Sequence, residues 1–166
     1  YHRPNFIEAV SVFSPCNDRF SSINLFSALT MNNDVHSAVG SITFTVTQDM
    51  TAMLEGKTIH KVCSTYSLCY FAEVAARRAI EPYFEPNENA IGALVEIKHI
   101  QPAPVGAELT VNAAVNEVKG KKIICDITIL CGAHTIATGK QIQIVLPDKD
   151  INALIENAYQ NLAQRS

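Results

Sequence analysis

Residues 64–80 read STYSLCYFAEVAARRAI, and this stretch decides the fold. Ser64 or Thr65 is a suitable N-cap and Pro82 follows the segment, so the stretch predicts a helix. From Leu68 onward the helix is apolar nearly all round, which is typical of a helix buried in a core. Its alanines would let strands approach closely on several sides. We therefore expect a highly curved sheet wrapped around this one helix.

The segments around the helix predict the strands of that sheet. Residues 109–115 alternate apolar and polar side chains, as a strand with one buried face does. Short turns at 119–121 and 132–133 would join it to the next two strands in an antiparallel meander. Two β-branched runs, joined by residues 50–56, predict strands before the helix. The expected strands, in chain order, are 42–46, 58–62, 91–100, 109–115, 123–131 and 135–146.

The length of the chain fits one domain with a single hydrophobic core. A single domain of 166 residues buries roughly 70% of the surface that its unfolded chain exposes. We expect an α+β domain over 41–146, preceded by an N-terminal extension over 1–40 in which 23–29 is compatible with a short helix. Residues 147–166 predict a C-terminal amphipathic helix whose apolar stripe packs outside the sheet.

Composition and charge exclude several classes of partner. The net charge is −3, so the chain has no basic field to hold nucleic acid. Its apolar runs are shorter than the roughly 20 residues that cross a bilayer, and no signal-peptide pattern is found. The odd number of cysteines argues against a disulfide framework, and the lack of tight clusters such as C-x-x-C argues against a zinc site, so we expect reduced core thiols. We expect a soluble, cytoplasmic protein that binds no metal; its cysteines are Cys16, Cys63, Cys69, Cys125 and Cys131.

Glu73 is the charge that stands out, because it lies in the middle of the apolar helix. A buried carboxylate is costly unless it is paired or functional. Arg77 follows four residues later, where an i,i+4 ion pair could instead hold Glu73 on a solvated stripe. The sequence alone leaves both interpretations open.

His99 and Thr65 are two further candidates. Alternation places Val95, Ile97 and His99 on one face of the 91–100 strand, so the imidazole is predicted to point towards the buried side. Histidine serves readily as a general base near neutral pH, although an isolated histidine on a strand is more often structural. Taken alone, Thr65 fits a helix cap better than a nucleophile.

A longer stretch is similar to a known family. Residues 92–106 read GALVEIKHIQPAPVG, which resembles the pattern G-x-x-V-x-x-x-H-x-x-P-x-P-V-G of the fluoroacetyl-CoA thioesterases. The resemblance extends over residues 41–146 and implies that family's hot-dog fold, a curved antiparallel sheet wrapped around a central helix. It also implies hydrolysis of an acyl thioester, carried by CoA or by acyl carrier protein, without a further cofactor.

The resemblance also implies site residues. The family's catalytic Thr, Glu and His match Thr65, Glu73 and His99 in order and spacing, and its active-site glycine matches Gly92. Exposed lysines, Lys140 among them, could meet the phosphates of CoA, although such lysines are usually solvated surface.

Two departures from the family's pattern affect the substrate pocket. Tyr66 stands where the family usually has a proline after the catalytic threonine. Residues 138–141 read TGKQ where the family has a Gly-x-His-type pattern. We therefore expect an acyl pocket that differs from that of the specialised fluoroacetyl-CoA enzymes.

Thioester hydrolysis assigns each residue a role. It needs a nucleophile, a base and donors to the oxyanion. His99 suits the base, and Thr65 supplies a hydroxyl at a helix N-terminus. Glu73 could orient His99, activate water, or attack the carbonyl to give an anhydride. About 12 Å of helical rise separates Thr65 from Glu73, so either Thr65 lies on a bend before the helix or a homodimer completes the site. We expect the homodimer.

The main alternative is a non-catalytic module that binds or senses acyl-CoA. It would keep the pocket but make little use of the three residues. A hot-dog dehydratase is disfavoured, since the Asp-x-Asn-Pro-x-His signature is absent from the sequence, as is the Asp-based motif of the hydroxybenzoyl-CoA thioesterases. The sequence also lacks G-x-S-x-G, the P-loop, G-x-G-x-x-G and H-E-x-x-H motifs.

Overall fold

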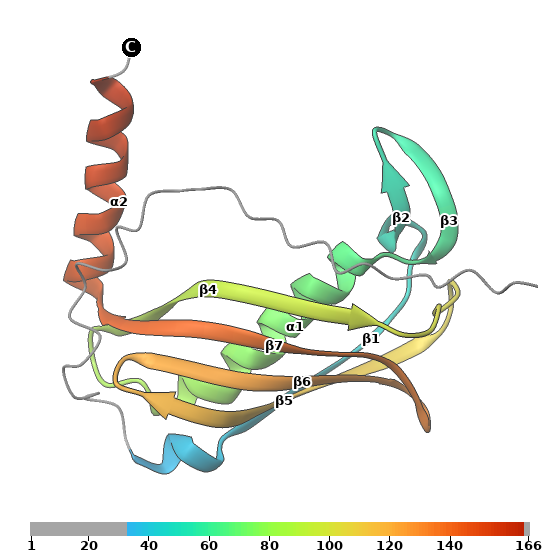
Figure 1. Ribbon diagram of the computed structural model, residues 1–166, viewed down its shortest axis with the longest axis horizontal. Coiled ribbons are helices and arrows are strands. Elements are labelled where there is room, and N and C mark those ends of the chain that lie inside the picture. The colour runs from blue at the N-terminus through green and yellow to red at the C-terminus, as the bar shows by residue number, and fades with distance from the viewer. Residues whose placement is uncertain (1–32, 165–166) are drawn as a thin grey trace, which may run out of the picture.

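A curled antiparallel sheet lies along one side of a long helix in the computed structural model, which describes residues 33–164 (Figure 1). The order of its five strands is β1-β5-β6-β7-β4, whereas β2 and β3 form a separate two-stranded sheet. This arrangement confirms the expected α+β architecture. The strands are β1 Val39–Thr45, β2 Thr51–Leu54, β3 Lys57–Cys63, β4 Glu88–His99, β5 Glu108–Lys119, β6 Lys122–Cys131 and β7 His134–Pro147; the helices are α1 Thr65–Ile80 and α2 Asp148–Ala163, and short 3-10 helices cover Asn33–Ser37, Gln48–Met50 and Glu81–Tyr83.

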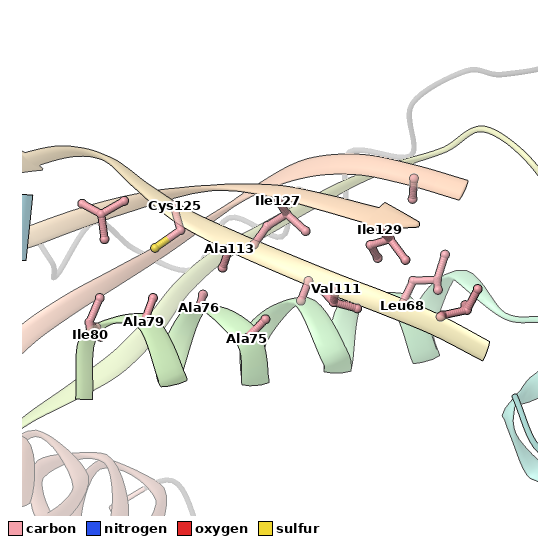
Figure 2. Packing of buried hydrophobic residues seen from close by; sticks show 14 of the residues in the cluster. Leu68, Ala75, Ala76, Ala79, Ile80, Val111, Ala113, Cys125, Ile127 and Ile129 are labelled. Atoms are coloured by element: carbon pink, nitrogen blue, oxygen red, sulfur yellow. The ribbon is translucent and has the colours of Figure 1, made fainter. Parts of the chain in front are cut away.

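Helix α1 forms where the sequence predicts it. The Ser64 hydroxyl accepts the backbone N–H of Ser67 at 3.1 Å, which satisfies one of the free donors of the first turn. The side of α1 that faces the sheet is lined by small residues, and Figure 2 shows them packed beneath the strands. A Cβ on Gly40 of β1 would overlap the backbone of Ala75 and Ala79, so this strand touches the helix almost backbone to backbone.

The opposite side of α1 is exposed, which corrects the expectation of burial on several sides. Tyr66, Tyr70 and Glu73 are all exposed in the chain. The apolar pattern was misleading here because a tyrosine has a large apolar ring and a polar end, so it can lie at a surface. The sheet therefore covers one side of the helix, and the side that carries Tyr66, Tyr70 and Glu73 is an open flank.

A β-bulge in β4 decides which of its side chains face the helix. The pairing with β7 shifts by one residue between Gly92 and Leu94. Before the shift Gly92 lies opposite Gln143, and after it Val95 lies opposite Gln141. Since an extra residue reverses the alternation of a strand, Gly92 and His99 face the same side although seven positions separate them.

The core is shared by the helix, the sheet and the segment before β1. Val35 and Ala38 are 1% and 2% exposed and belong to the same cluster as Leu68 and Ile129. The folded unit thus begins before residue 41, while the helix considered for residues 23–29 lies outside the described residues. Strand β2 is an addition that the sequence did not predict: it pairs with β3 in a hairpin that projects from the sheet (Figure 1).

The four described cysteines, Cys63, Cys69, Cys125 and Cys131, are free thiols, as expected; Cys16 lies outside the described residues. Burial raises the pKa of the Cys63 thiol to about 11. Burial, with the Asp126 carboxylate as a smaller cause, raises the pKa of the Cys125 thiol to about 11 as well. Both therefore behave as inert core residues at neutral pH.

Helix α2 contacts β4 and β7 near its beginning and then projects away from the sheet (Figure 1). Ile151 is half-buried, and every later described residue of the helix is exposed. The expectation that its apolar stripe packs against the outside of the sheet is therefore wrong within this chain. The connection through Pro147, in extended conformation, directs the helix away from the strands.

Candidate active site

Thr65 and His99 meet at the open flank of the helix. Thr65 is the first residue of α1 and His99 the last residue of β4. The Thr65 Oγ1 lies 3.1 Å from the His99 Nδ1, a hydrogen-bond distance. Thr65 is exposed and His99 half-buried, so a substrate can reach both. The predicted inward orientation of His99 is confirmed, since the neighbouring Lys98 is exposed.

The backbone determines which ring nitrogen of His99 carries the proton. Nε2 lies 2.9 Å from the carbonyl oxygen of Gln101. A carbonyl oxygen only accepts, so in the neutral ring Nε2 must be the protonated nitrogen that donates to it. Nδ1 then presents a lone pair, and the Thr65 hydroxyl donates its proton to it. This is the geometry in which a histidine can take a proton from a hydroxyl group.

Neighbouring contacts fix the start of the helix. The backbone N–H of Cys63 donates to the Ala103 carbonyl at 2.8 Å, which ties the strand before α1 to the segment after His99. The Tyr66 hydroxyl donates to the Thr51 carbonyl at 2.7 Å and so links the first turn of α1 to the β2–β3 hairpin. The tyrosine that replaces the family's proline thus acts as an anchor for that hairpin.

Glu73 lies two turns further along α1, against Gly92 of β4. A Cβ on residue 92 would overlap the Oε1 of Glu73, so the carboxylate occupies the space that the missing side chain leaves. Glu73 is exposed, and no hydrogen bond or ion pair within residues 33–164 engages its carboxylate. Burial, with the Glu73 charge as a smaller cause, raises the pKa of the Cys69 thiol.

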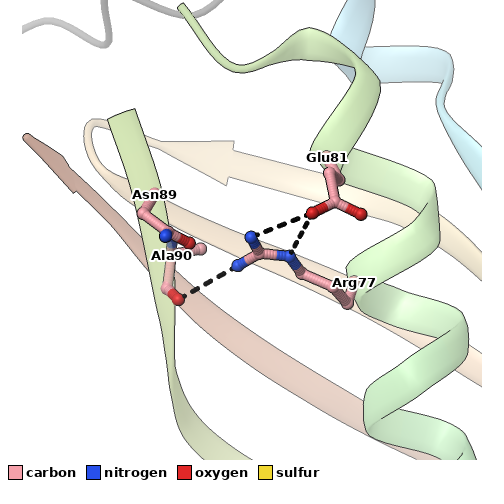
Figure 3. A network of polar contacts seen from close by, with 4 residues as sticks. All are labelled: Arg77, Glu81, Asn89 and Ala90. Carbon is pink, nitrogen blue, oxygen red and sulfur yellow. Dashed lines mark hydrogen bonds and ion pairs between the residues drawn. The ribbon is translucent and has the colours of Figure 1, made fainter. Parts of the chain in front are cut away.

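Arg77 has partners other than Glu73. Its guanidinium donates to the Glu81 carboxylate, with Nη2 to Oε1 at 3.1 Å, and to the Ala90 carbonyl at 3.2 Å (Figure 3). The ring of Phe84 lies 4.8 Å from the guanidinium carbon. The alternative in which Arg77 pairs with Glu73 is therefore wrong, because the arginine points along the helix towards its C-terminal end.

Two buried glutamines lie beside Gly92, and the sequence drew attention only to Gln141, as part of the departure from the family's Gly-x-His-type pattern. Gln141 and Gln143 of β7 are 0% and 3% exposed and face the helix side of the sheet. Both amide atoms of Gln141 and the Nε2 of Gln143 are buried without a hydrogen-bond partner. A signal did exist, since the two amides stand at inward positions that alternation would assign to apolar residues.

Lys140 lies apart from these groups. It is exposed on β7, between two inward-facing residues, and lies opposite Glu96 and Asp126 of the adjacent strands on the outer face of the sheet. Within one chain it does not share a face with Gly92. Lys119 and Lys122 lie at the turn between β5 and β6.

The predicted residues thus form two groups within one chain: Thr65 with His99, and Glu73 with Gly92. Thr65 belongs to α1 itself, which removes the proposed bend before the helix. About 12 Å of helical rise still separates Thr65 from Glu73, and no contact between the two groups is found in the described residues.

One surface hollow lies away from these two groups. This hollow, of about 670 Å³, lies where β4 and α2 begin, but its lining of carboxylates, amides, prolines and Lys149 contains no histidine or hydroxyl group. Within residues 33–164 no group of three or more His, Cys, Asp or Glu is arranged to hold a metal ion. None of the helices in this range is long and apolar enough to cross a membrane.

Comparison with solved structures places the fold. A thioesterase superfamily member from Thermus thermophilus matches with a TM-score of 0.75 and 25% identity, over 78% of this chain and 96% of that one. A hot-dog-like protein from Thermanaerovibrio acidaminovorans matches with a TM-score of 0.71 and 16% identity, over 76% of this chain and 96% of that one. A variant of the fluoroacetyl-CoA-specific thioesterase matches with a TM-score of 0.66 and 23% identity, over 74% and 95%. The fold is the hot-dog fold.

Comparison of sequences identifies the family. The fluoroacetyl-CoA thioesterase of Streptantibioticus cattleyicolor is 27% identical over 95 residues, which are 57% of this chain and 68% of that protein. The family model described as fluoroacetyl-CoA-specific thioesterase matches residues 46–149, a range that holds all three predicted catalytic residues. The chain therefore belongs to the fluoroacetyl-CoA-specific thioesterase family and is a thioester hydrolase with a hot-dog fold.

Proposed function

We propose that this protein hydrolyses small or medium acyl thioesters of CoA, or of acyl carrier protein, with Thr65, His99 and Glu73 as its catalytic residues. The observation that carries the proposal is the hydrogen bond from the Thr65 hydroxyl to the unprotonated Nδ1 of His99. The pair lies on the open flank of α1, within reach of a substrate. No cofactor is needed beyond the thioester itself.

In the proposed reaction His99 acts as the general base. Its Nδ1 takes the proton of the attacking hydroxyl, either that of Thr65 or that of a water beside it, and the oxygen adds to the thioester carbonyl. The bond from Nε2 to the Gln101 carbonyl stabilises the resulting imidazolium. When the carbon–sulfur bond breaks, the leaving thiolate takes that proton from Nδ1. If Thr65 is the nucleophile, a water repeats the sequence to release the acid.

The N-terminus of α1 supplies donors for the developing oxyanion. The N–H of Ser67 is occupied by the Ser64 cap, and the N–H of Leu68 donates to the Ser64 carbonyl. The N–H groups of Thr65 and Tyr66 have no acceptor in the described part of the chain. They lie beside the nucleophile, and a helix N-terminus favours negative charge.

A homodimer would join the two groups of residues. β4 is an edge strand of 12 residues, and its Leu94 is 43% exposed. Such an edge is prone to pair with a second strand. In an antiparallel pair of two β4 strands, the His99 end of one lies beside the Gly92 end of the other. Glu73 of one chain would then approach Thr65 and His99 of the second, where it orients the imidazole, activates a water or attacks the carbonyl.

The test is a thiol-release assay across acyl-CoA chain lengths, with wild type, Glu73→Ala and His99→Ala. We expect wild-type turnover, and a loss in kcat of about 100-fold or more for His99→Ala. His134→Ala is the matched control, because His134 is exposed at the β6–β7 turn and should leave turnover unchanged. A His99→Ala variant as fast as wild type would refute the mechanism. If wild type binds acyl-CoA but hydrolyses none, the protein is the binding module instead.

The four described free thiols also support a cytoplasmic location, which we propose as part of this function.

A further inference from the structure

We propose that Gln141 is a positioning residue for Glu73, with its side-chain amide as the hydrogen-bond donor that holds the Glu73 carboxylate over Gly92. The inference rests on the proposed function, since it assumes that Glu73 takes part in thioester hydrolysis. It assigns a role to a residue that the family's pattern does not predict, because this chain has Gln141 where the family's strand has a histidine.

The first observation is geometric. The Nε2 of Gln141 lies 3.8 Å from the point where a Cβ of residue 92 would stand, and the Oε1 of Glu73 lies closer still to that point. The amide and the carboxylate therefore border the same small space, which exists because residue 92 is a glycine.

The second observation is that Gln141 has no other use in the fold. It is 0% exposed, and neither its Nε2 nor its Oε1 has a hydrogen-bond partner. Its neighbours across the strands are Val95 of β4 and Cys125 of β6, which offer it no side-chain acceptor. A buried amide without partners destabilises a protein, and an apolar side chain of the same shape would pack better there. The proposed hydrogen bond to Glu73 supplies a partner for its Nε2.

The third observation concerns Glu73. Its carboxylate has no donor in residues 33–164, and Arg77, the nearest cation along the helix, is held by Glu81 and the Ala90 carbonyl. A neutral amide can orient a carboxylate without neutralising it, whereas an arginine would hold it in a permanent ion pair. Gln141 is therefore suited to fix the position of Glu73 and leave its charge available.

The test compares Gln141→Met with Gln143→Met. Both variants remove an amide with an unpartnered Nε2 from the same face of β7. They differ in their distance from the space that the Glu73 carboxylate occupies: the Gln141 Nε2 is one of the three atoms nearest to the point where a Cβ of residue 92 would stand, and no atom of Gln143 is. We expect Gln141→Met to lower kcat by about 10- to 100-fold with little change in KM, and Gln143→Met to keep the wild-type kcat. Both should raise the midpoint of thermal unfolding by about 2–4 °C, because an unsatisfied polar group is removed.

A double-mutant cycle separates positioning from a general loss of structure. In a Glu73→Gln background, Gln141→Met should lower kcat no further, since the carboxylate that it positions is gone. Gln141→His restores an N–H donor and should recover part of the lost kcat. Two results overturn the inference while the proposed function stands. One is a wild-type kcat in Gln141→Met; the other is a Gln141→Met substitution that lowers kcat as much in the Glu73→Gln background as in the wild type. If wild type hydrolyses no thioester, the proposed function fails, and the inference fails with it.

Discussion

At the scale of single residues, the orientation of His99 within one chain depends on a backbone carbonyl. The Gln101 carbonyl fixes the proton on Nε2, whatever side chain residue 101 carries. The tautomer of the base is therefore set by the path of the chain after β4. This leaves the Thr65 hydroxyl as the direct side-chain partner of the ring in the described structure.

Thr65 can be tested with two substitutions of similar size. Thr65→Val keeps the shape but removes the hydroxyl, and we expect kcat to fall by about 100-fold or more. Thr65→Ser keeps the hydroxyl and should stay within about 10-fold of wild type. Steady-state thiol release measures both, and near-UV circular dichroism checks the fold. Equal rates for Thr65→Val and wild type would show that His99 acts on water without help from the hydroxyl.

Alanine substitutions at Gly92 and Gly139 should have opposite effects, the first on kcat and the second on stability. In Gly92→Ala the new methyl group meets the carboxylate of Glu73, a mobile end of a side chain, so we expect a large loss of kcat and little change in stability. In Gly139→Ala it meets the backbone carbonyl of Glu96, which cannot move aside, so the free energy of unfolding should fall by about 3 kcal/mol. Chemical denaturation and the thiol-release assay, run on both variants, separate the two effects. A Gly92→Ala variant as unstable as Gly139→Ala would contradict this assignment.

The buried thiols predict a loss of stability at alkaline pH. The pKa of Cys63 and of Cys125 is raised from 9.0 to about 11. Between these values the folded thiol keeps its proton and the unfolded thiol loses it, so the free energy of unfolding falls as the pH rises from 9 to 11. The loss should reach roughly 2 kcal/mol per thiol. Urea unfolding measured at pH values across this range gives the free energy of unfolding. It should fall less steeply with pH in the Cys63→Ala/Cys125→Ala double variant, which keeps every other group that titrates at alkaline pH.

At the scale of elements, the N-cap of α1 links stability to catalysis. Ser64→Ala removes the acceptor for the Ser67 N–H, and we expect the free energy of unfolding to fall by about 1 kcal/mol. Because Thr65 begins the same turn, kcat should fall too. Ser37→Ala is the control: the Ser37 hydroxyl makes an exposed hydrogen bond to the Asp34 carbonyl, far from α1 in the chain, so both quantities should be unchanged. An unchanged kcat in Ser64→Ala would show that the position of Thr65 does not depend on the cap.

The elements also show what the sequence could predict. Strong local signals, such as the alternation of Leu109 to Val115 and the cap before α1, predicted β5 and the helix correctly. Strand β2 was missed because Glu55 and Gly56 form a tight turn with positive φ, and only that turn brings the short apolar run 52–54 against β3. The exposed side of α1 was missed because burial is set by the curvature of the sheet, which local pattern does not encode.

Some features of the candidate site could also be predicted from the sequence, and others could not. The inward position of His99 follows from alternation alone, but its contact with Thr65 depends on the path of the chain from β3 into α1. The bulge in β4, which brings Gly92 to the same side as His99, has no signature in the alternation. The role of Gln101 could not be predicted, since a backbone carbonyl has no signature in the sequence. The choice between a paired and an unpaired Glu73 required the position of Arg77, which Ala90 and Glu81 determine.

At the scale of the whole molecule, the proposed homodimer predicts that two inactive chains restore each other. A mixed dimer of Glu73→Ala and His99→Ala chains has one site with both defects and one intact site. Co-expression of the two chains should recover about a quarter of wild-type activity per chain, because half of the dimers are mixed and each has one intact site of two. Tandem affinity purification isolates the mixed dimer, and light scattering measures its mass. Sites contained in one chain would give no recovery.

The bulge in β4 has a consequence for the descent of this protein. Gly92 and His99 are seven positions apart, an odd number, so a regular strand can turn only one of them towards α1. A lineage that deleted the extra residue would place the glycine and the histidine six positions apart, and a regular strand would still turn both of them towards α1. In an alignment of relatives, a one-residue gap at this point is therefore compatible with an intact site, whereas a chain that keeps the seven-residue spacing needs the bulge to bring both residues to α1.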